Sequence, residues 1–597
     1  MVLRGCDPKL LTDRRFILAV FAAVVLSFAF FASNLKPTYD WIPNPLPSRP
    51  TSSFRVPPKN LEDPDVVELD YLSFRPIKSD HVKSYWNIPY ASSAGGKNRF
   101  RGPQPVDKKY KGVMEWSGKL GMCPVIQKID ATLRNHKDLA GEDVPGIETD
   151  HTEDCLSLNV FAPIDAEPGD DLPVVVNIPG GGFHLPGRAN GGELCAKSRG
   201  KDDKGVIVIT MYYRNGIYGF LSGDQIEQDG DFNNGLRDQR AALEWIQKYI
   251  RYFGGNPDHV VIMGTSAGAA SVMLQLSANG GNHSVPTPGV GRTQLFHGAI
   301  TQSPGAPTFF TKEQANKFFR EVAEGLNCTD LSVDCVRRAS VGDLYYENYP
   351  MSFPGRKTPP RWMWAPTTEA PGNLWTESAP VAMLGGRYAK VPSIIGFTTN
   401  EATDQTKKTT DSEAEMKSYI ADHYPLLTDT DLALIVKNYP NDVHWPDSGR
   451  WWDAVAKAQS DLRYICPTYL SSHAMAAHNP PAVPTYQYQW DVVWGVDSSN
   501  GYGTKHAATV GKIMSRADNA ISDYFVSFIK HLDPNVGRQV DSPKWVPLHR
   551  EKERGERLLF TNRANQSVTE MRMEGLDGER ESRCRDVLGM FPRLQFT

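Results

Sequence analysis

The sequence predicts an α/β fold in which helices cover a large, mostly parallel sheet. Short apolar runs alternate with stretches of helical periodicity along most of the chain. Several of these runs are apolar throughout, which is typical of strands that are buried on both faces of a sheet. Together, these two observations predict the α/β class.

Six apolar runs are predicted to be strands: residues 172–178, 205–213, 259–264, 297–300, 391–397 and 485–492. Between the second and third of them, residues 234–253 carry apolar side chains at helical spacing. That stretch ends at Gly254 and Gly255, a pattern that marks a helix C-terminus. Longer stretches at 328–390 and 403–484 are expected to be loop-rich insertions.

The N-terminal region differs in kind from the rest of the chain. Residues 16–33 form an uncharged apolar run that is long enough to cross or nearly cross a bilayer as a helix. The basic residues before it favour a cytosolic N-terminus. We therefore expect a cytosolic tail at 1–15, a signal-anchor helix at 16–33, a proline-rich stalk at 34–65 and a folded domain at 66–597.

Cleavage of the apolar run as a signal peptide is the alternative, and it would make the protein secreted. Phe30 and Phe31 precede Ala32, so the small-residue cleavage pattern is poor and an anchor is favoured. A mature N-terminus near Asn34 would identify the cleaved form. Both alternatives place the folded domain on the lumenal or extracellular side of a membrane, where disulfides form.

The cysteines fit that compartment. Cys123 and Cys155 bracket a polar segment, and Cys328 and Cys335 bracket a shorter one, so we predict two disulfides that close surface loops. Cys6 precedes the apolar run. The remaining cysteines have no obvious partner and are expected to be free thiols: Cys195, Cys466 and Cys584.

Charge excludes one class of partner. The chain has 65 basic and 69 acidic residues and a net charge of −4, so nothing favours binding to nucleic acid. Three N-x-S/T tripeptides are candidate glycosylation sites, and they support a lumenal location only weakly: Asn282, Asn327 and Asn565.

One serine stands between two glycines in the segment GTSAG, residues 264–268. The glycines permit a sharp strand-to-helix turn that places the Ser266 hydroxyl above the sheet edge. A bare G-x-S-x-G is often an incidental turn. Because a predicted strand precedes Ser266 and a small-residue helical stretch follows it, the segment favours a nucleophile.

A serine nucleophile needs a base, an orienting acid and donors for the oxyanion. Residues 177–183, NIPGGGF, follow a predicted strand with three glycines, whose backbone amides we expect to face a developing negative charge. A flexible glycine loop is the alternative. We predict the amides of Gly181, Gly182 and Ala267 as the oxyanion donors.

Long segments resemble the type-B carboxylesterase and lipase family, the cholinesterase-like branch of the α/β-hydrolases. Residues 253–268 are similar to the family's nucleophile signature, and residues 153–163 to its second signature, with Ser157 where tyrosine or threonine is commoner. Further similar segments cover nearly everything after the stalk: residues 88–91, 99–105, 212–221, 233–246 and 523–535.

The resemblance implies the α/β-hydrolase fold, with long loop insertions, and a type-B catalytic domain at 66–597. It also implies the disulfides Cys123–Cys155 and Cys328–Cys335, in agreement with the loop argument. Many relatives have histidine or tyrosine before the glycine loop, where this chain has Pro179. Because that position mainly shapes the loop, we expect the oxyanion donors to be retained.

The family's triad runs in the order serine, glutamate, histidine, and its acid follows a strand in a stretch of the form G-x-x-x-x-E. The segment GFTTNE places Glu401 there, whereas Asp404 lies farther from the strand end and is expected to be a loop carboxylate. The family uses the region of Glu153 structurally, and we expect Glu153 to pair with Arg99.

His506 stands where the family carries its catalytic histidine, after the last predicted core strand. The family follows that histidine with a small residue and soon an acidic one, whereas Ala507, Ala508 and Thr509 follow here. A plain surface histidine is therefore the alternative for His506. The other late histidines considered lie before that strand or near the last helix: His473, His478, His531 and His549.

The resemblance implies ester hydrolysis through an acyl-enzyme, with no metal and no organic cofactor. In this mechanism His506 takes the Ser266 proton, Glu401 orients the imidazolium, and the backbone amides stabilise the tetrahedral oxyanion. A silent adhesion or scaffold protein of the same fold and an acyltransferase with the same triad are the alternatives. The motifs do not distinguish hydrolysis from acyl transfer or define the oligomeric state.

The expected substrate is a small carboxylic ester. Choline-ester hydrolases of the family receive the cationic head on a tryptophan between the first cysteine pair, but residues 123–155 contain no Trp, Tyr or Phe. We therefore expect fairly apolar, uncharged esters. Trp362, Trp364 and Phe183 are candidates for the lining of an acyl pocket, although aromatic residues are more often simply core.

Overall fold

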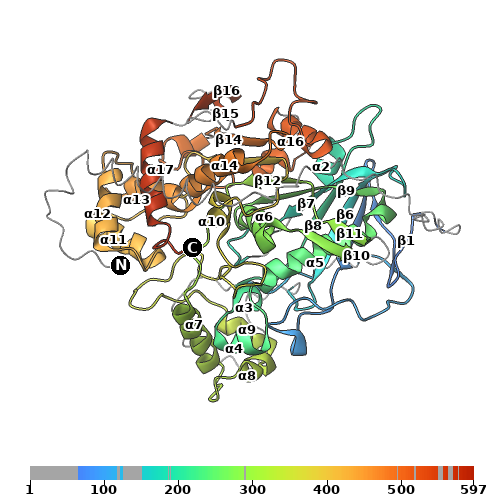
Figure 1. The fold of residues 1–597 in the computed structure, drawn as a ribbon, viewed down its shortest axis with the longest axis horizontal. Helices are drawn as coiled ribbons and strands as arrows, with labels where there is room; N and C mark the ends of the chain where they lie inside the picture. Colours follow the sequence, from blue (N-terminus) through green and yellow to red (C-terminus); the bar gives the residue numbers. More distant parts are fainter. Residues whose placement is uncertain are drawn as a thin grey trace, which may run out of the picture. The chain divides into compact units, whose positions relative to one another are not determined.

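The main sheet of the described residues has eleven strands (Figure 1), in the order β16-β15-β14-β13-β12-β9-β7-β8-β6-β4-β3. Neighbours from β15 to β8 pair in parallel, and antiparallel strands complete both edges. The strands are Ile77–Lys78 (β3), Val82–Pro89 (β4), Ser157–Pro163 (β6), Leu172–Ile178 (β7), Ile207–Met211 (β8), Gly255–Thr265 (β9), Gly298–Gln302 (β12), Ser393–Thr398 (β13), Thr485–Asp491 (β14), Glu556–Asn562 (β15) and Thr569–Gly575 (β16). The predicted α/β class and mostly parallel sheet are confirmed.

The computed structural model describes residues 63–596 with these gaps: 64, 117–120, 126–150, 186, 188–189, 288–290, 494, 516–519, 549–555, 563–568 and 576. The tail at 1–15, the signal-anchor helix at 16–33 and nearly all of the stalk at 34–65 lie outside these residues, as do His549 and Asn565. Among the helices that are described, none has the length and apolarity needed to span a bilayer.

Two small sheets accompany the main one. The first joins Val67–Glu68 (β1), Ser73–Phe74 (β2) and Val113–Met114 (β5), and the second joins Ser284–Thr287 (β10) and Gly291–Gln294 (β11). The α-helices are Gly192–Lys197 (α2), Gly216–Phe220 (α3), Asp224–Asp229 (α4), Asn234–Tyr249 (α5), Ala267–Ser277 (α6), Lys312–Gly325 (α7), Val333–Arg338 (α8), Val341–Glu347 (α9), Ala379–Leu384 (α10), Glu413–His423 (α11), Asp429–Asn438 (α12), Trp452–Ser460 (α13), Cys466–His478 (α14), Val510–Ile513 (α15), Ala520–His531 (α16) and Gly578–Met590 (α17).

Helices cover both faces of the central strands because those strands are apolar on both faces. In β7, Val175 packs in one hydrophobic cluster with residues of α2 and α16. Its neighbours Val174 and Val176 point to the opposite face and pack in a cluster with residues of α5 and α6. Figure 1 shows α2 and α16 on one side of these strands and α5 and α6 on the other. Period-two alternation of purely apolar residues therefore fixes the sheet as a middle layer.

The helix predicted at 234–253 is α5, which ends at Tyr249 and continues as a 3₁₀ turn, Ile250–Phe253, up to Gly254 with φ 89°. The stretch 403–484 is not loop-rich as predicted, because it contains α11, α12, α13 and α14. Side chains of Ser412 and Thr428 cap the N-termini of α11 and α12, and these caps satisfy amides that a helix leaves unpaired.

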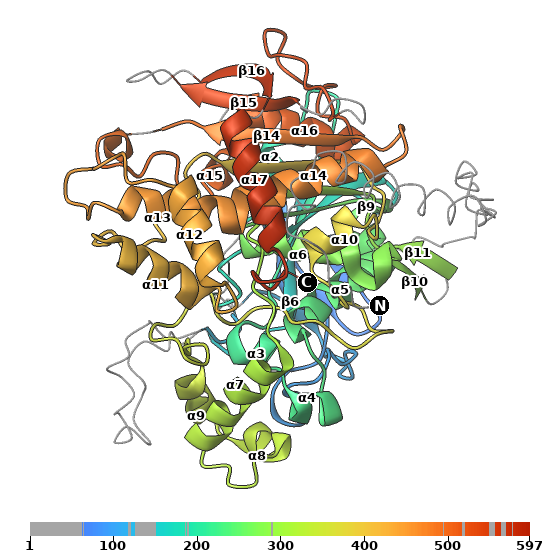
Figure 2. The same cartoon turned by 60° about the vertical axis from the view of Figure 1, so that its left-hand side comes forward.

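A π-helical turn, Asp461–Ile465, joins α13 to α14, with the Cys466 amide donating to the Asp461 carbonyl five residues back. The final helix, α17, contacts α14 and this turn, as Figure 2 shows for α14. Asp461 is buried and accepts from Nε of Arg583 on α17 at 3.1 Å. The turn is thus anchored by the C-terminal helix.

Disulfides Cys123–Cys155 and Cys328–Cys335 are present as predicted. Cys466 and Cys584 were expected to be free thiols, and that expectation is wrong, because a third disulfide joins them across 118 residues and ties α14 to α17. Cys195 is a free, buried thiol.

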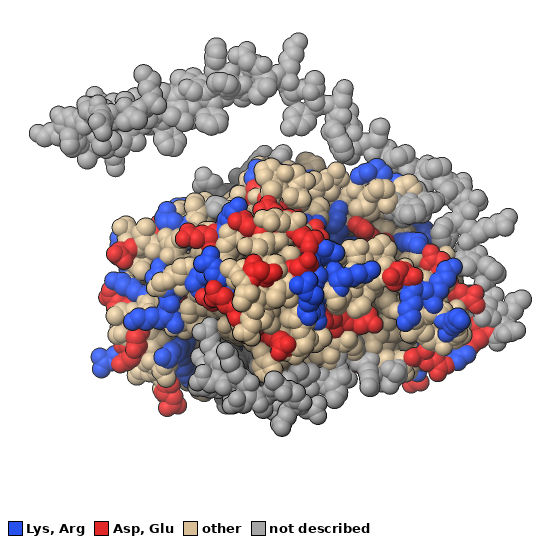
Figure 3. Space-filling model, turned by 90° about the horizontal axis from the view of Figure 1, so that it is seen from below, with Lys and Arg blue, Asp and Glu red and all other residues tan. Residues whose placement is uncertain are grey.

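Charge is mixed on the face seen in Figure 3, where lysine, arginine and carboxylate side chains are interspersed.

Candidate active site

Ser266 occupies the turn between β9 and α6. Its backbone has φ 59° and ψ −124°, a strained conformation for a residue other than glycine. The turn is tight enough that a Cβ on Gly264 would lie 2.4 Å from the carbonyl carbon of Gly268, and one on Gly268 would lie 2.0 Å from the Ile178 carbonyl oxygen. Both glycines are therefore required by close backbone contacts. The predicted strand-turn-helix setting of Ser266 is present.

The glycine loop that follows β7 lies directly against this turn. A Cβ on Gly180 would lie 3.1 Å from the Cβ of Ser266, so the backbones approach as closely as glycine allows. Gly181 and Gly182 adopt φ 120° and 65°, which only glycine adopts readily. Ala267 opens α6, and the first amides of a helix have no partner within it. The glycine loop and the N-terminus of α6 thus both adjoin Ser266.

Glu401 and His506 are in contact, as the sequence predicted for the acid and the base. Oε2 of Glu401 lies 2.5 Å from Nδ1 of His506, and Oε1 accepts from the Thr398 amide at 2.7 Å. Glu401 is fully buried and His506 is nearly so. An ionised carboxylate only accepts, so Nδ1 carries the proton and Nε2 is left as an acceptor. Nε2 is buried and has no hydrogen-bond partner among the described residues.

Gln302, at the end of β12, links the serine turn to the histidine segment. Its carbonyl accepts from the Ser266 amide at 2.9 Å, and its side-chain Oε1 accepts from the Thr509 hydroxyl at 2.9 Å. Thr509 lies three residues after His506 and is fully buried. The residues AAT that depart from the family pattern therefore include a hydroxyl that fastens the histidine segment beside Ser266.

An aromatic wall connects the glycine loop to His506. The indole of Trp362 lies over Gly182, where a Cβ would be 2.1 Å from its ring, and its Nε1 donates to Gln405 at 3.2 Å. The hydroxyl of Tyr464 donates to the same oxygen of Gln405 at 2.7 Å. The Tyr464 ring lies 4.6 Å from that of His506, centroid to centroid. Neither Gln405 nor Tyr464 was identified from the sequence, because neither belongs to a recognisable motif.

Two of the aromatic residues predicted to line an acyl pocket belong to the core instead. Trp364 is fully buried and packs on Phe310 and Phe318, and Phe183 packs edge-on against Phe220. Their rings fill space between helices, so they are not available to a ligand. Only Trp362 of that group is half-exposed beside the glycine loop.

An apolar pocket lies beside α6, one turn beyond Ser266. Ala270, whose amide donates to the Ser266 carbonyl, lines it together with Met273 and Leu274. Its opposite wall comes from the loop after β12 and from α10 and α14: Pro304, Gly305, Ala306, Pro307, Ala379, Pro380, Pro467, Thr468 and Ser471. Its apolar lining suits a hydrocarbon chain.

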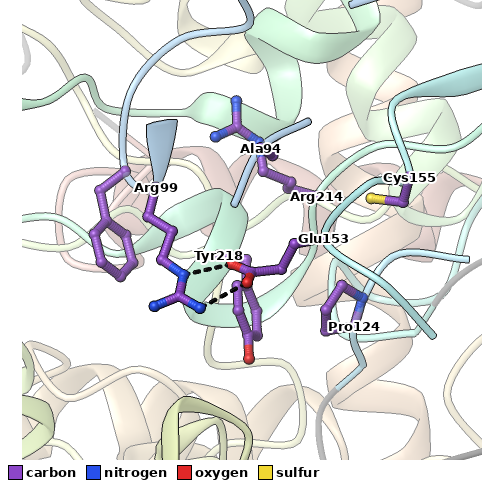
Figure 4. A pocket seen from close by; sticks show the side chains of 8 residues that line it. Ala94, Arg99, Pro124, Glu153, Cys155, Arg214 and Tyr218 are labelled. Atoms are coloured by element: carbon purple, nitrogen blue, oxygen red, sulfur yellow. Dashed lines mark hydrogen bonds and ion pairs between the residues drawn. The ribbon is translucent and has the colours of Figure 1, made fainter. Parts of the chain in front are cut away.

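A second hollow belongs to the framework. Figure 4 shows it around Arg99, Glu153 and Tyr218, and Arg99 donates to both carboxylate oxygens of Glu153 at 2.6 and 2.7 Å. The predicted pairing is confirmed. Burial raises the pKa of the Asp404 carboxyl, and among the described residues no hydrogen bond joins this carboxyl to His506. The main-chain carbonyl of Asp404 accepts from Arg361. Asp404 is therefore not part of the Glu401–His506 pair.

Two further histidines border the site from behind the wall. His184, after the glycine loop, accepts from the Trp364 amide at 2.9 Å, and burial lowers its pKa to about 3. His423, at the end of α11, lies beside the Arg361 amide, and burial lowers its pKa to about 4. Both are neutral near pH 7. Of the other late histidines, His473 packs on Tyr469 and His478 bonds to the Leu384 carbonyl, away from Glu401.

A serine in a strained turn after a central strand, beside a glycine loop and a buried Glu-His pair, is the arrangement of an α/β-hydrolase. The chain belongs to the carboxylesterase family, whose model matches residues 73–575. It is accordingly a carboxylic ester hydrolase of the α/β-hydrolase fold.

Known relatives agree with this assignment. Lipase 1 of Geotrichum candidum is 30% identical over 76% of this chain and 85% of its own length. Para-nitrobenzyl esterase of Bacillus subtilis is 25% identical over 81% of this chain and 93% of its own. The crystal structure of Aspergillus niger EstA, at 28% identity, superposes with a TM-score of 0.77 and covers 89% of this chain and 99% of EstA.

Proposed function

We propose that this protein hydrolyses carboxylic esters with Ser266 as nucleophile, His506 as general base and Glu401 as the acid that orients His506. The observation that carries the proposal is the buried Glu401–His506 pair, whose free Nε2 belongs to a segment fastened to the Ser266 turn through Gln302. An ordered, buried pair of this kind supports catalysis over a silent scaffold.

In the proposed reaction, Nε2 of His506 takes the Ser266 proton as Oγ attacks the ester carbonyl. Amides of Gly181, Gly182 and Ala267 stabilise the oxyanion that forms. His506 then protonates the departing alcohol, and the same imidazole activates the water that releases the acid. Glu401, dehydrated and held by the Thr398 amide, stabilises the imidazolium at each step.

The proposed substrates are fairly apolar esters, with the apolar pocket beside α6 as the site for a hydrocarbon part. Support comes from the apolar lining of this pocket and from its place one helical turn beyond Ser266. The names of the relatives, which are lipases and an esterase for para-nitrobenzyl compounds, point in the same direction.

We further propose that the catalytic domain works on the lumenal or extracellular side of a membrane, with residues 16–33 as its anchor. The three disulfides are typical of an oxidising compartment. Two of the relatives are described as secreted, Secreted lipase 1 of Botryotinia fuckeliana and Secreted triacylglycerol lipase LIP1 of Gibberella zeae.

A fluorophosphonate probe tests the assignment of the triad. Wild type is expected to be labelled and to hydrolyse short- and long-chain esters, and Ser266→Ala to lose both properties. His506→Ala is expected to lose turnover by several orders of magnitude. His473→Ala is the matched control, since this late histidine is also buried but packs elsewhere. Labelling of Ser266→Ala at the wild-type level would refute the nucleophile, and full activity of His506→Ala would refute the base.

A further inference from the structure

The loop that follows β13 carries two buried polar side chains, Glu401 and Gln405. They lie four residues apart, and the Gln405 amide donates to the Ala402 carbonyl at 3.0 Å, so both belong to one hydrogen-bonded turn. The carboxylate of Glu401 contacts Nδ1 of His506 directly. One short segment therefore carries the acid of the proposed triad and a second polar group that the triad itself does not use.

The side-chain oxygen of Gln405 accepts hydrogen bonds from two other segments. The Tyr464 hydroxyl donates to it at 2.7 Å, and Nε1 of Trp362 donates to it at 3.2 Å. An amide oxygen has two lone pairs, so both of its acceptor positions are filled. Because Gln405 and Tyr464 are buried, breaking their bond would leave a polar group without a partner. The oxygen is thus held from two sides.

The ring of Tyr464 is the packing partner of the His506 imidazole. The two ring centroids lie 4.6 Å apart, with 49° between the ring planes. The bond to Glu401 holds the imidazole at Nδ1 only, so a packed neighbour must fix the direction of Nε2. Gly305 lies close behind Tyr464, since a Cβ there would be 2.9 Å from Cε1 of the tyrosine. The tyrosine ring therefore has no room to retreat on that side.

These contacts close a circuit around the imidazole, in the order Glu401, His506, Tyr464, Gln405 and back to Glu401 along the chain. The turn at 401–405 thus holds the imidazole twice, once through the carboxylate and once through the tyrosine ring. Gln405 is the residue that completes the second connection.

We propose that Gln405 is a positioning residue for the hydrolysis. Through the Tyr464 hydroxyl it holds the imidazole of His506, so that Nε2 stays aligned with the Ser266 hydroxyl. Gln405 touches no reacting atom, and the inference rests on the proposed function. A displacement of about 1 Å at a catalytic group costs on the order of 100-fold in rate, so a bond at this distance from the reaction affects turnover.

Breaking the bond from either end tests the proposal. Gln405→Met removes the acceptor at similar side-chain length, and Tyr464→Phe removes only the hydroxyl. Each variant is expected to lower kcat on a short-chain ester by about 10- to 100-fold and to leave KM within about threefold. Because both break the same bond, the double variant is expected to lose at most about twofold more than the weaker single variant. The rate constant of fluorophosphonate labelling should fall in parallel, because the probe reacts with the same activated serine.

Tyr388→Phe is the matched control. Tyr388 is also buried and its hydroxyl donates to Asn479 at 2.7 Å, but no ring contact joins it to His506 among the described residues. This variant should lower the melting temperature about as much as Tyr464→Phe does and keep kcat within about twofold. If Gln405→Met does not fold, Tyr464→Phe decides the matter.

Three results would overturn the proposal: losses of kcat no larger than in the control, changes confined to KM, or losses that multiply in the double variant. Each of them would reduce Gln405 to a structural or substrate-lining residue. Absent hydrolysis and absent fluorophosphonate labelling of wild type would instead overturn the proposed function.

Discussion

Glu401 shows how much the candidate site depends on single atoms. Its carboxylate is fully buried, with one oxygen on the Thr398 amide and the other on Nδ1 of His506. The first bond fixes the side chain, and the second fixes the tautomer and the orientation of the imidazole. A buried carboxylate in these contacts stabilises a positive charge on His506 far better than water does.

Replacing Glu401 by glutamine should therefore damage turnover more than structure. We expect Glu401→Gln to lower kcat by roughly 10³- to 10⁴-fold, because a neutral amide neither enforces the tautomer nor stabilises the imidazolium. Initial rates on a short-chain ester, with a melting curve to verify folding, measure this. Asp404→Asn is the matched control and should stay within threefold, whereas an equal loss there would contradict the assignment of the acid.

The buried, neutral histidines make the folded state less stable at acidic pH. The pKa of His423 is about 4 in the folded chain and near 6.5 when unfolded, so only the unfolded state takes up its proton between these values. Stability is thus full above pH 6.5 and falls as the pH drops toward 4, by on the order of 2 kcal/mol at pH 5. Melting curves of wild type and His423→Gln should show a smaller loss from pH 7 to 5 in the variant. An unchanged slope would contradict this, and His531→Gln, at an exposed site, is the control.

At the scale of elements, α17 holds the π-helical turn in place behind the candidate site. Asp461 bonds to Arg583, the Cys466–Cys584 disulfide lies next to this ion pair, and Tyr464 of the same turn packs on His506. The C-terminal helix therefore supports the wall of the candidate site, although it contributes no residue to the proposed triad.

Removing the Cys466–Cys584 disulfide should weaken the attachment of α17 to the π-helical turn. We expect the double variant Cys466→Ser, Cys584→Ser to lose about 2–4 kcal/mol of unfolding free energy, since the bond closes a long loop in the unfolded chain. Denaturant unfolding under non-reducing conditions measures the change. The Cys328–Cys335 disulfide closes a loop of only 7 residues, so the double variant Cys328→Ser, Cys335→Ser should lose less unfolding free energy. A larger loss of unfolding free energy in the Cys328, Cys335 variant than in the Cys466, Cys584 variant would contradict this expectation.

The elements that the sequence predicted are those whose physical cause is local. Short runs rich in apolar and aromatic residues identified β7, β8, β9 and β12 to β14, and the glycines fixed the Ser266 turn. The antiparallel strands were missed because their residues are mixed; β6, which lies between β8 and β4, carries the buried Asn159, whose amide donates to Thr210 on β8. The Cys466–Cys584 bond, Gln405 and Tyr464 all depend on contacts between distant segments, which no local pattern encodes.

At the scale of the whole molecule, the two described N-x-S/T asparagines suit glycosylation. Asn282 and Asn327 are both exposed, Asn282 at the end of a 3₁₀ turn and Asn327 just after α7. If the domain passes through a secretory compartment, both side chains are accessible to modification. In the described structure, nothing around these two side chains requires the asparagine amide to stay unmodified.

Protein made in a eukaryotic secretory host should therefore run at a higher mass that falls after treatment with a peptide N-glycosidase. Asn282→Gln and Asn327→Gln should each remove one step of that shift, and Asn565→Gln tests the third tripeptide. Thr308→Ala serves as a control outside any such tripeptide. A mass that the enzyme leaves unchanged would argue against a lumenal location of the domain.

The π-helical turn also limits how this chain can change over generations. One residue more than an α-helical turn holds is accommodated between α13 and α14, and Asp461, Tyr464 and Cys466 each face a different partner as a result. Deleting a single residue there would restore regular helical hydrogen bonding and improve the local helix. It would also rotate every later side chain of α14 out of register. Ordinary helices tolerate small insertions and deletions at their ends. At this one turn, however, we expect even a one-residue insertion or deletion to abolish function.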